Sequence, residues 1–187
     1  MIQAQRNRVN QALYQARLLL KAAADWQDEL SLLAWQQTCY EAALRALDQA
    51  RVAFLRELAA VYRLDVRKVA SAADLQQLAA ARQQRLPELE RFNTRFADPF
   101  QPLSRLSLLL DELNRAAVPA EAPAAGNWMP EDQPTALVID RINLIAMEDT
   151  NSESVHSKEK KQLLQALDIH QALQQLIQEL RETFYED

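Results

Sequence analysis

The residue types that most often carry catalysis or bind metals are few and scattered in this 187-residue sequence. It has one cysteine, Cys39, and two histidines, His156 and His170. A structural zinc site needs four Cys or His ligands, which this chain cannot supply. One cysteine also excludes an intrachain disulfide. Because Cys39 follows a line of small residues along a predicted helix, we expect a buried, unreactive thiol.

Glycine is scarcer still, since Gly126 is the only one, where average usage would give about 13. Phosphate-binding loops need several glycines for their positive φ angles and close backbone approach. The nucleophile elbow of α/β-hydrolases also needs more than one glycine. The sequence therefore excludes both classes of site, and we predict no cofactor.

Acidic residues do not form a convincing metal site either. A di-iron bundle needs two Glu-x-x-His motifs, and the sequence has one, Glu153 to His156, in a polar stretch. Two acidic groups resemble in part the magnesium-binding pairs of all-α pyrophosphatases: Asp25, Asp28 and Glu29, and Asp111 and Glu112. Acids at a helix junction also suit the positive end of the next helix dipole. We therefore predict no catalytic and no metal-binding residues.

Arg51 is the only charged residue on the main apolar stripe of a long predicted helix. Such an arginine usually buries its stem and reaches solvent or a carboxylate, here Asp48. The alternative is a guanidinium that faces a ligand in a groove lined also by Tyr40 and Tyr62. His170 borders an apolar face, where we expect a hydrogen-bonded structural histidine.

The element that must position these residues is the stretch 31–64, which contains no glycine and no proline. Large apolar residues recur in it every seven residues, which predicts one continuous amphipathic helix. They are Leu33, Tyr40, Leu47, Phe54 and Val61. A parallel line of small residues (Cys39, Ala46, Ala53 and Ala60) would let other helices approach closely. We expect this helix to be the centre of the fold.

The remaining helices follow from the same spacing of apolar residues. A helix over 2–24 should pack antiparallel to the long one, because only a short turn around Trp26 separates them. Ser71 and Asp74 have the spacing of a capping box, which predicts a helix over 72–85. We expect further helices over 87–97, 102–117 and 158–183 and a short one near 66–70. In the last long helix, Ile169, Leu173, Leu176 and Leu180 should face the core, with Leu164 and Ile177 beside them.

Residues 118–134 hold four of the seven prolines and the only glycine, so we interpret them as a linker or strap. Residues 136–145 form the one segment with strand character. A single strand needs a partner, which could be residues 143–146, a second subunit or another protein; alternatively, the segment is an apolar strap. We predict that it contacts a partner or a second copy through Leu137, Val138, Ile139, Ile142 and Leu144. Residues 148–156 are polar, and we expect them to be mobile.

The net charge of −5 is unevenly distributed. Residues 1–117 carry 16 basic and 13 acidic residues (net +3), whereas residues 118–187 carry 5 and 13 (net −8). We expect the acidic C-terminal part to dock on the basic first helix. The alternative is an exposed basic surface of Arg6, Arg8, Arg17 and Lys21 that meets an acidic partner or nucleic acid, although overall acidity makes nucleic acid unlikely. No apolar run reaches the ~18–20 residues of a membrane span, and no signal-peptide pattern begins the chain, so we expect a cytoplasmic protein.

The order of these elements resembles a family of small uncharacterised gammaproteobacterial helical proteins, known only as a domain of unknown function. The features that carry the resemblance are the N-terminal helix pair, the ending Tyr62-Arg63-Leu64, the Pro/Ala-rich linker, Leu137-Val138-Ile139 and the final amphipathic helix. The resemblance implies a helical fold and no activity.

We predict an all-α, mostly antiparallel bundle of five or six helices around residues 31–64. Residues 1–117 form its core, 118–134 a linker or strap, and 135–187 a short extended segment and a last helix on the same bundle. We expect a non-enzymatic interaction or accessory protein that binds a protein partner or forms a homodimer. The alternative is a degenerate bundle enzyme or a small-ligand or nucleotide binder with a groove near Arg51.

Overall fold

A computed structural model of the protein describes residues 1–28, 30–116 and 152–183. These residues form six α-helices, one short 3-10 helix and no strand, which confirms the predicted all-α class. The elements are α1 (Ile2–Ala24), α2 (Leu32–Val61), η1 (Val66–Lys68), α3 (Ala72–Ala81), α4 (Pro87–Ala97), α5 (Ser104–Ala116) and α6 (Ser152–Thr183). The segment 136–145, with its predicted contacts Leu137, Val138, Ile139, Ile142 and Leu144, lies outside the described residues, as does the linker 118–134.

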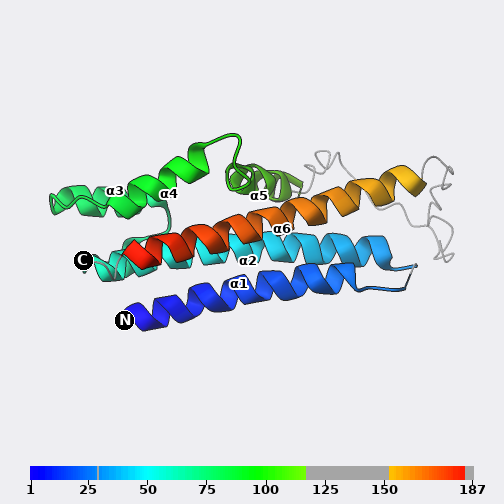
Figure 1. Cartoon of the computed structure of the whole chain (residues 1–187), viewed down its shortest axis with the longest axis horizontal. Coiled ribbons are helices and arrows are strands. Elements are labelled where there is room, and N and C mark those ends of the chain that lie inside the picture. The colour runs from blue at the N-terminus through cyan, green and yellow to red at the C-terminus, as the bar shows by residue number, and fades with distance from the viewer. Residues whose placement is uncertain (29, 117–151, 184–187) are drawn as a thin grey trace, which may run out of the picture.

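Three long helices lie side by side and form the body of the molecule (Figure 1). The α1–α2 pair has the largest interface, and its two helices are antiparallel as predicted. Their connection is fixed by Trp26 and Trp35, whose rings stack with centroids 4.7 Å apart. The α6 helix runs antiparallel to α1 and contacts both α1 and α2. Because α2 contacts each of the other five described α-helices, the long helix is the centre of the core as expected.

The predicted apolar stripe of α2 is buried except at its two ends, Leu33 and Val61. Leu44, Leu47, Phe54 and Leu58 are at most 1% exposed. Leu33 is 38% exposed, because it lies in the first turn of α2, which the other helices leave uncovered. The spacing of apolar residues in the sequence does not show where this cover ends. The central part of the stripe therefore supplies most of the hydrophobic stabilisation of the fold.

The short helices α3, α4 and α5 form a second layer over one side of the long helices (Figure 1). Phe92 of α4 packs against Phe54 of α2, with ring centroids 5.8 Å apart. Leu103 and Leu106 bring the start of α5 onto the same core. Ser71 and Asp74 make the capping box that the sequence predicts at the start of α3.

Two helices end earlier than predicted, and the reason is the same at both ends. Arg63 and Gln83 adopt left-handed backbone angles, with φ of 56° and 55°. After α2, the amide of Leu64 donates to the carbonyl of Ala59 at 2.8 Å, which is the long bond of a Schellman motif. Glycine is the usual residue at such positions, so its absence hid both helix ends in the sequence.

The α6 helix begins at Ser152, although the sequence predicts a mobile polar stretch up to His156 and a helix from 158. Residues 152–156 lack the apolar periodicity that predicts a packed helix, so the sequence did not indicate this extension of α6. In Figure 1 the start of α6 extends beyond the first turn of α2. The predicted start of this helix at residue 158 was therefore wrong by six residues. None of the described helices is long and apolar enough to cross a membrane.

Candidate functional site

The three residues of the predicted ligand groove, of which Tyr62 is the C-cap residue of α2, lie along one side of this helix but do not form a common site. Tyr40, Arg51 and Tyr62 follow one another at intervals of eleven residues, which places neighbours roughly 17 Å apart along the helix axis. Arg51 pairs with Asp48, its Nη2 2.6 Å from Oδ1, as the structural interpretation predicts. The hydroxyl of Tyr62 donates to Glu88 at 2.5 Å.

Tyr40 is buried, and its hydroxyl has no hydrogen-bond partner among the described residues. Burial, and then the charge of Glu112, raise the pKa of this hydroxyl above its usual value. Burial also raises the pKa of the Cys39 thiol, which keeps it protonated and unreactive at neutral pH. Neither residue therefore offers an ionised nucleophile or base.

Among the acidic residues at the α1–α2 corner, Asp28 has a structural role. The carboxylate of Asp28 accepts hydrogen bonds from the hydroxyl of Ser31 at 2.6 Å and from the amide of Leu30 at 3.3 Å. Glu29 lies outside the described residues. Within the described ranges, no three His, Cys, Asp or Glu side chains lie together as metal ligands.

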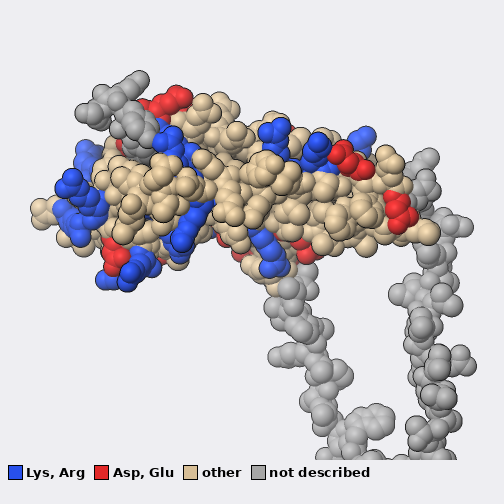
Figure 2. Space-filling view, turned by 90° about the horizontal axis from the view of Figure 1, so that it is seen from below, with Lys and Arg blue, Asp and Glu red and all other residues tan. Residues whose placement is uncertain are grey.

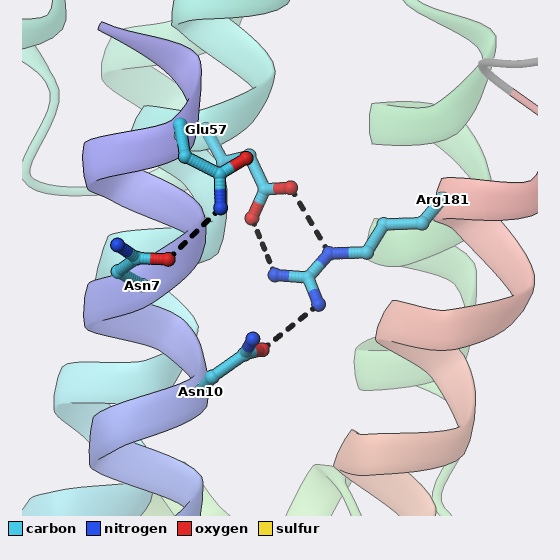
Figure 3. Close-up of polar contacts among 5 residues, drawn as sticks. Asn7, Asn10, Glu57 and Arg181 are labelled. Carbon is cyan, nitrogen blue, oxygen red and sulfur yellow. Dashed lines mark hydrogen bonds and ion pairs between the residues drawn. The ribbon is translucent and has the colours of Figure 1, made fainter.

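A buried ion pair joins α6 to α2 (Figure 3). The guanidinium of Arg181 donates through Nη2 and Nε to the two carboxylate oxygens of Glu57, at 2.6 and 3.0 Å. A third guanidinium nitrogen, Nη1, donates to Oδ1 of Asn10 on α1 at 3.0 Å. The side chain of Glu57 is only 3% exposed and that of Arg181 13%. One arginine therefore ties all three long helices together at this end of the bundle.

His170 forms a second polar link between α1 and α6. It is buried, and its Nε2 lies 3.1 Å from the carbonyl oxygen of Leu13, which can only accept, so Nε2 carries the proton in this contact. Burial lowers the pKa of the imidazole, and the charge of Arg17 lowers it further, against the opposing effect of the Leu13 carbonyl. His170 is thus the structural histidine that the sequence predicts.

A hollow of about 600 Å³ lies open to solvent between α1, the start of α2 and the first half of α6, and is here called the apolar groove. Its apolar lining consists of Leu20, Ala24, Leu32, Leu163, Leu164 and Leu167. Leu164 is 53% exposed. It lies beside the core residues of α6, as predicted, but it is not buried. No helix in the described residues covers this face, because α3, α4 and α5 lie on the other side of the long helices (Figure 1).

Cations border the apolar groove. Arg17 and Lys21 of α1 and Lys160 of α6 line it, together with the neutral Gln36, and no acidic residue is among the described residues that line it. Figure 2, which views the molecule from the α1 side, shows Lys and Arg along the upper edge, with some acidic groups between and beside them. The groove therefore combines exposed leucines with positive charge.

The expectation that acidic residues of the C-terminal part dock on the basic first helix stays a prediction, because most of these acids lie outside the described residues. In the described part of α6, the ion pair at the three-helix junction places the cation, Arg181, on α6 and the carboxylate, Glu57, on α2. A second, more exposed ion pair joins Glu179 of α6 to Arg95 of α4, and the apolar stripe of α6 packs on the core. The excess negative charge of residues 118–187 comes largely from 118–151 and 184–187, which lie outside the described residues.

A second hollow, of about 560 Å³, lies farther along the same seam between α1 and α6 and is here called the polar hollow. Arg17 lines both hollows, so the two are neighbours along the seam. The polar hollow is lined by Arg6, Asn10, Tyr14, Gln174 and Gln178, among others, and by one acid, Glu182. Of the four cations that the sequence indicates on α1, Arg6, Arg17 and Lys21 therefore face this seam, whereas Arg8 lines neither hollow.

The sequence contains a signal for the apolar groove in the spacing of its lining residues. Arg17, Leu20, Lys21 and Ala24 follow the i, i+3, i+4, i+7 spacing of one helix face, and Lys160, Leu163, Leu164 and Leu167 repeat it on α6. In its first half, α6 thus carries more apolar residues than its contact with α1 and α2 buries. Which part of a wide stripe stays exposed depends on packing, which the spacing does not show.

The sequence matches the family described as "Family of unknown function (DUF6586)" over residues 1–186. The chain belongs to this family. No curated protein and no solved structure matches the chain. Membership of DUF6586 confirms the resemblance to a family of unknown function, while the gammaproteobacterial origin stays a prediction.

Proposed function

We propose that this DUF6586 protein acts without catalysis, by binding a helical segment of a partner protein in the apolar groove. The observation that supports the proposal is the cluster of incompletely buried leucines on α6 and α2, with Leu164 more than half exposed. Scattered single leucines are common on protein surfaces, but several that line one hollow are typical of an interaction site.

The geometry favours a helix as the bound element. The lining residues span 17–24 on α1 and 160–167 on α6, which is about 12 Å or two turns on each antiparallel helix. A helix placed along this seam would add a fourth long element to α1, α2 and α6. Its apolar residues at i, i+3 or i+4 and i+7 would bury Leu164, and full burial of a leucine is worth about 1.5–3 kcal/mol.

A pair of matched variants tests this function. Leu164→Glu places a charge in the groove, and Leu108→Glu places the same charge at a leucine that is 60% exposed on α5. We would immobilise the wild-type chain and both variants, expose them to lysate of the organism that encodes the protein and identify retained proteins by mass spectrometry. Circular dichroism would check that both variants remain folded.

We expect a set of proteins, or free copies of the chain itself, retained by the wild type and Leu108→Glu but lost from Leu164→Glu. Light scattering would separate the two cases, because binding of a second copy changes the molar mass of the purified chain. If all three chains retain the same proteins, or if none retains any protein and all are monomeric, the proposed function is wrong.

A further inference from the structure

We infer that the partner segment is an acidic amphipathic helix, an inference that rests on the function proposed above. It is based on the charges around the apolar groove and on the polar hollow beside it. Three cations, Arg17, Lys21 and Lys160, border the leucines, and no acid is among the described groove residues. A purely apolar or basic segment would leave these cations unpaired or repelled, whereas Asp and Glu beside its leucines would pair with them.

The positive character of the groove comes from α1 as a whole. This helix has no Asp or Glu over its 23 residues, although it carries four basic residues. Lys21 belongs to its last turn, where a cation also suits the negative end of the helix dipole. No ion pair joins Arg17, Lys21 or Lys160 to another described residue, so an approaching carboxylate would not have to displace an acid of the described bundle.

The polar hollow extends the site and sets the length of the segment. The seam from Arg6 to Ala24 covers about 27 Å, which corresponds to a helix of about 18 residues. Two turns of such a helix would lie in the apolar groove and present leucine-type anchors. The other turns would lie over Asn10, Tyr14 and Gln174, where carboxylates away from Glu182 can accept hydrogen bonds from amide and hydroxyl donors.

Synthetic peptides provide the probe. We would prepare two fluorescein-labelled peptides of about 18 residues with the same leucine anchors, one with Glu and one with Lys at the flanking positions. Fluorescence anisotropy would measure their binding to the intact chain at about 0.1 M and about 1 M salt, where the Debye length is about 10 Å and about 3 Å. Further titrations would use a peptide of residues 135–149 of this chain and vesicles of anionic phospholipid.

Charge-reversal variants identify the cations. Lys21→Glu/Lys160→Glu reverses two groove cations, and Arg91→Glu/Arg105→Glu makes the same change of net charge at exposed residues of α4 and α5. We expect the Glu peptide to bind, to weaken at high salt and to lose at least about tenfold in affinity with the groove reversal, because attraction becomes repulsion. The control reversal should change the affinity less than about twofold, and Leu164→Glu should abolish binding.

Several outcomes would overturn the inference. They are equal or tighter binding of the Lys peptide, no binding of either peptide, equal losses in the two charge reversals, or a preference for the 135–149 peptide or for vesicles. If neither peptide binds while retention of a natural partner still depends on Leu164, the inferred acidic character of the segment is wrong and the proposed function remains. If Leu164 is irrelevant to retention as well, both are wrong.

Discussion

Replacing Arg181 by Met should destabilise the protein by about 3–5 kcal/mol, because it leaves the Glu57 carboxylate buried without a partner. Glu57 is 3% exposed, and Arg181 supplies hydrogen bonds to both of its oxygens, at 2.6 and 3.0 Å. Methionine keeps the apolar stem of the side chain, so the loss reports the charge and its hydrogen bonds. For a domain whose total stability is about 5–15 kcal/mol, this is a large fraction.

The ion pair between Arg95 and Glu179 provides the matched control. Its nitrogen and oxygen are 3.6 Å apart, and its side chains are 48% and 43% exposed. Exposed pairs of this kind contribute about 0–1 kcal/mol, since water and salt screen them. Arg95→Met should therefore change the free energy of unfolding by less than about 1 kcal/mol.

Urea denaturation followed by circular dichroism would measure both variants and a double variant, Glu57→Leu/Arg181→Met. The double variant removes both charges, so it should recover most of the stability that Arg181→Met loses. Because 1 kcal/mol corresponds to about 2–4 °C at this chain length, the single variant should lower Tm by about 6–20 °C. The reasoning is refuted if Arg181→Met resembles Arg95→Met, or if the double variant is as unstable as the single one.

The remaining predictions concern helix ends, pH and the segment outside the described residues. Arg63→Gly and Gln83→Gly should each raise the free energy of unfolding in urea by about 0.5–1 kcal/mol, because glycine adopts positive φ without strain; a loss of stability would contradict this. Burial holds the pKa of His170 below its ordinary 6.5, so the unfolded chain takes up this proton first, and stability should be full above about pH 6.5 and fall as pH is lowered. This fall in Tm between about pH 7.5 and 5.5 should shrink in His170→Gln, and an unchanged slope would contradict it. Val138→Asp/Ile142→Asp should reduce self-association or partner retention, and unchanged molar mass and unchanged partners would reject that contact.

Much of the fold follows from the sequence, because packing in a helical bundle obeys local rules. The near absence of glycine and the seven-residue spacing from Tyr40 to Phe54 predict a long central helix, and both residues are buried in it. The capping box of Ser71 and Asp74 also involves only neighbouring residues, so its spacing is sufficient to predict it.

The polar interior could not be predicted in the same way. Glu57 and Arg181 are 124 residues apart in sequence, and nothing in their local patterns pairs them. An acid inside an apolar register indicates that a partner is needed, but it does not say which helix supplies the partner. The register between α2 and α6 decides this, and it depends on the packing of all three long helices.

The apolar groove could be predicted from the sequence only in part. The spacing of Leu163, Leu164 and Leu167 is visible in the sequence, yet the same spacing serves a buried stripe equally well. Only the arrangement of α1, α2 and α6 shows that Leu164 stays exposed and that Lys160 lies across the groove from Lys21. The chemical character of the site thus follows from residues of two helices that are far apart in sequence.

Photo-crosslinking in living cells tests the central claim most directly. A benzophenone side chain would replace Leu164 in the apolar groove or, as a control, Leu108 on α5, and mass spectrometry would identify the crosslinked peptide. We predict a crosslink from position 164, and none from 108, to a partner segment that carries Asp and Glu around apolar residues at helical spacing. The same products from both positions, or no product from position 164, would contradict the assignment of this groove as the partner-binding site.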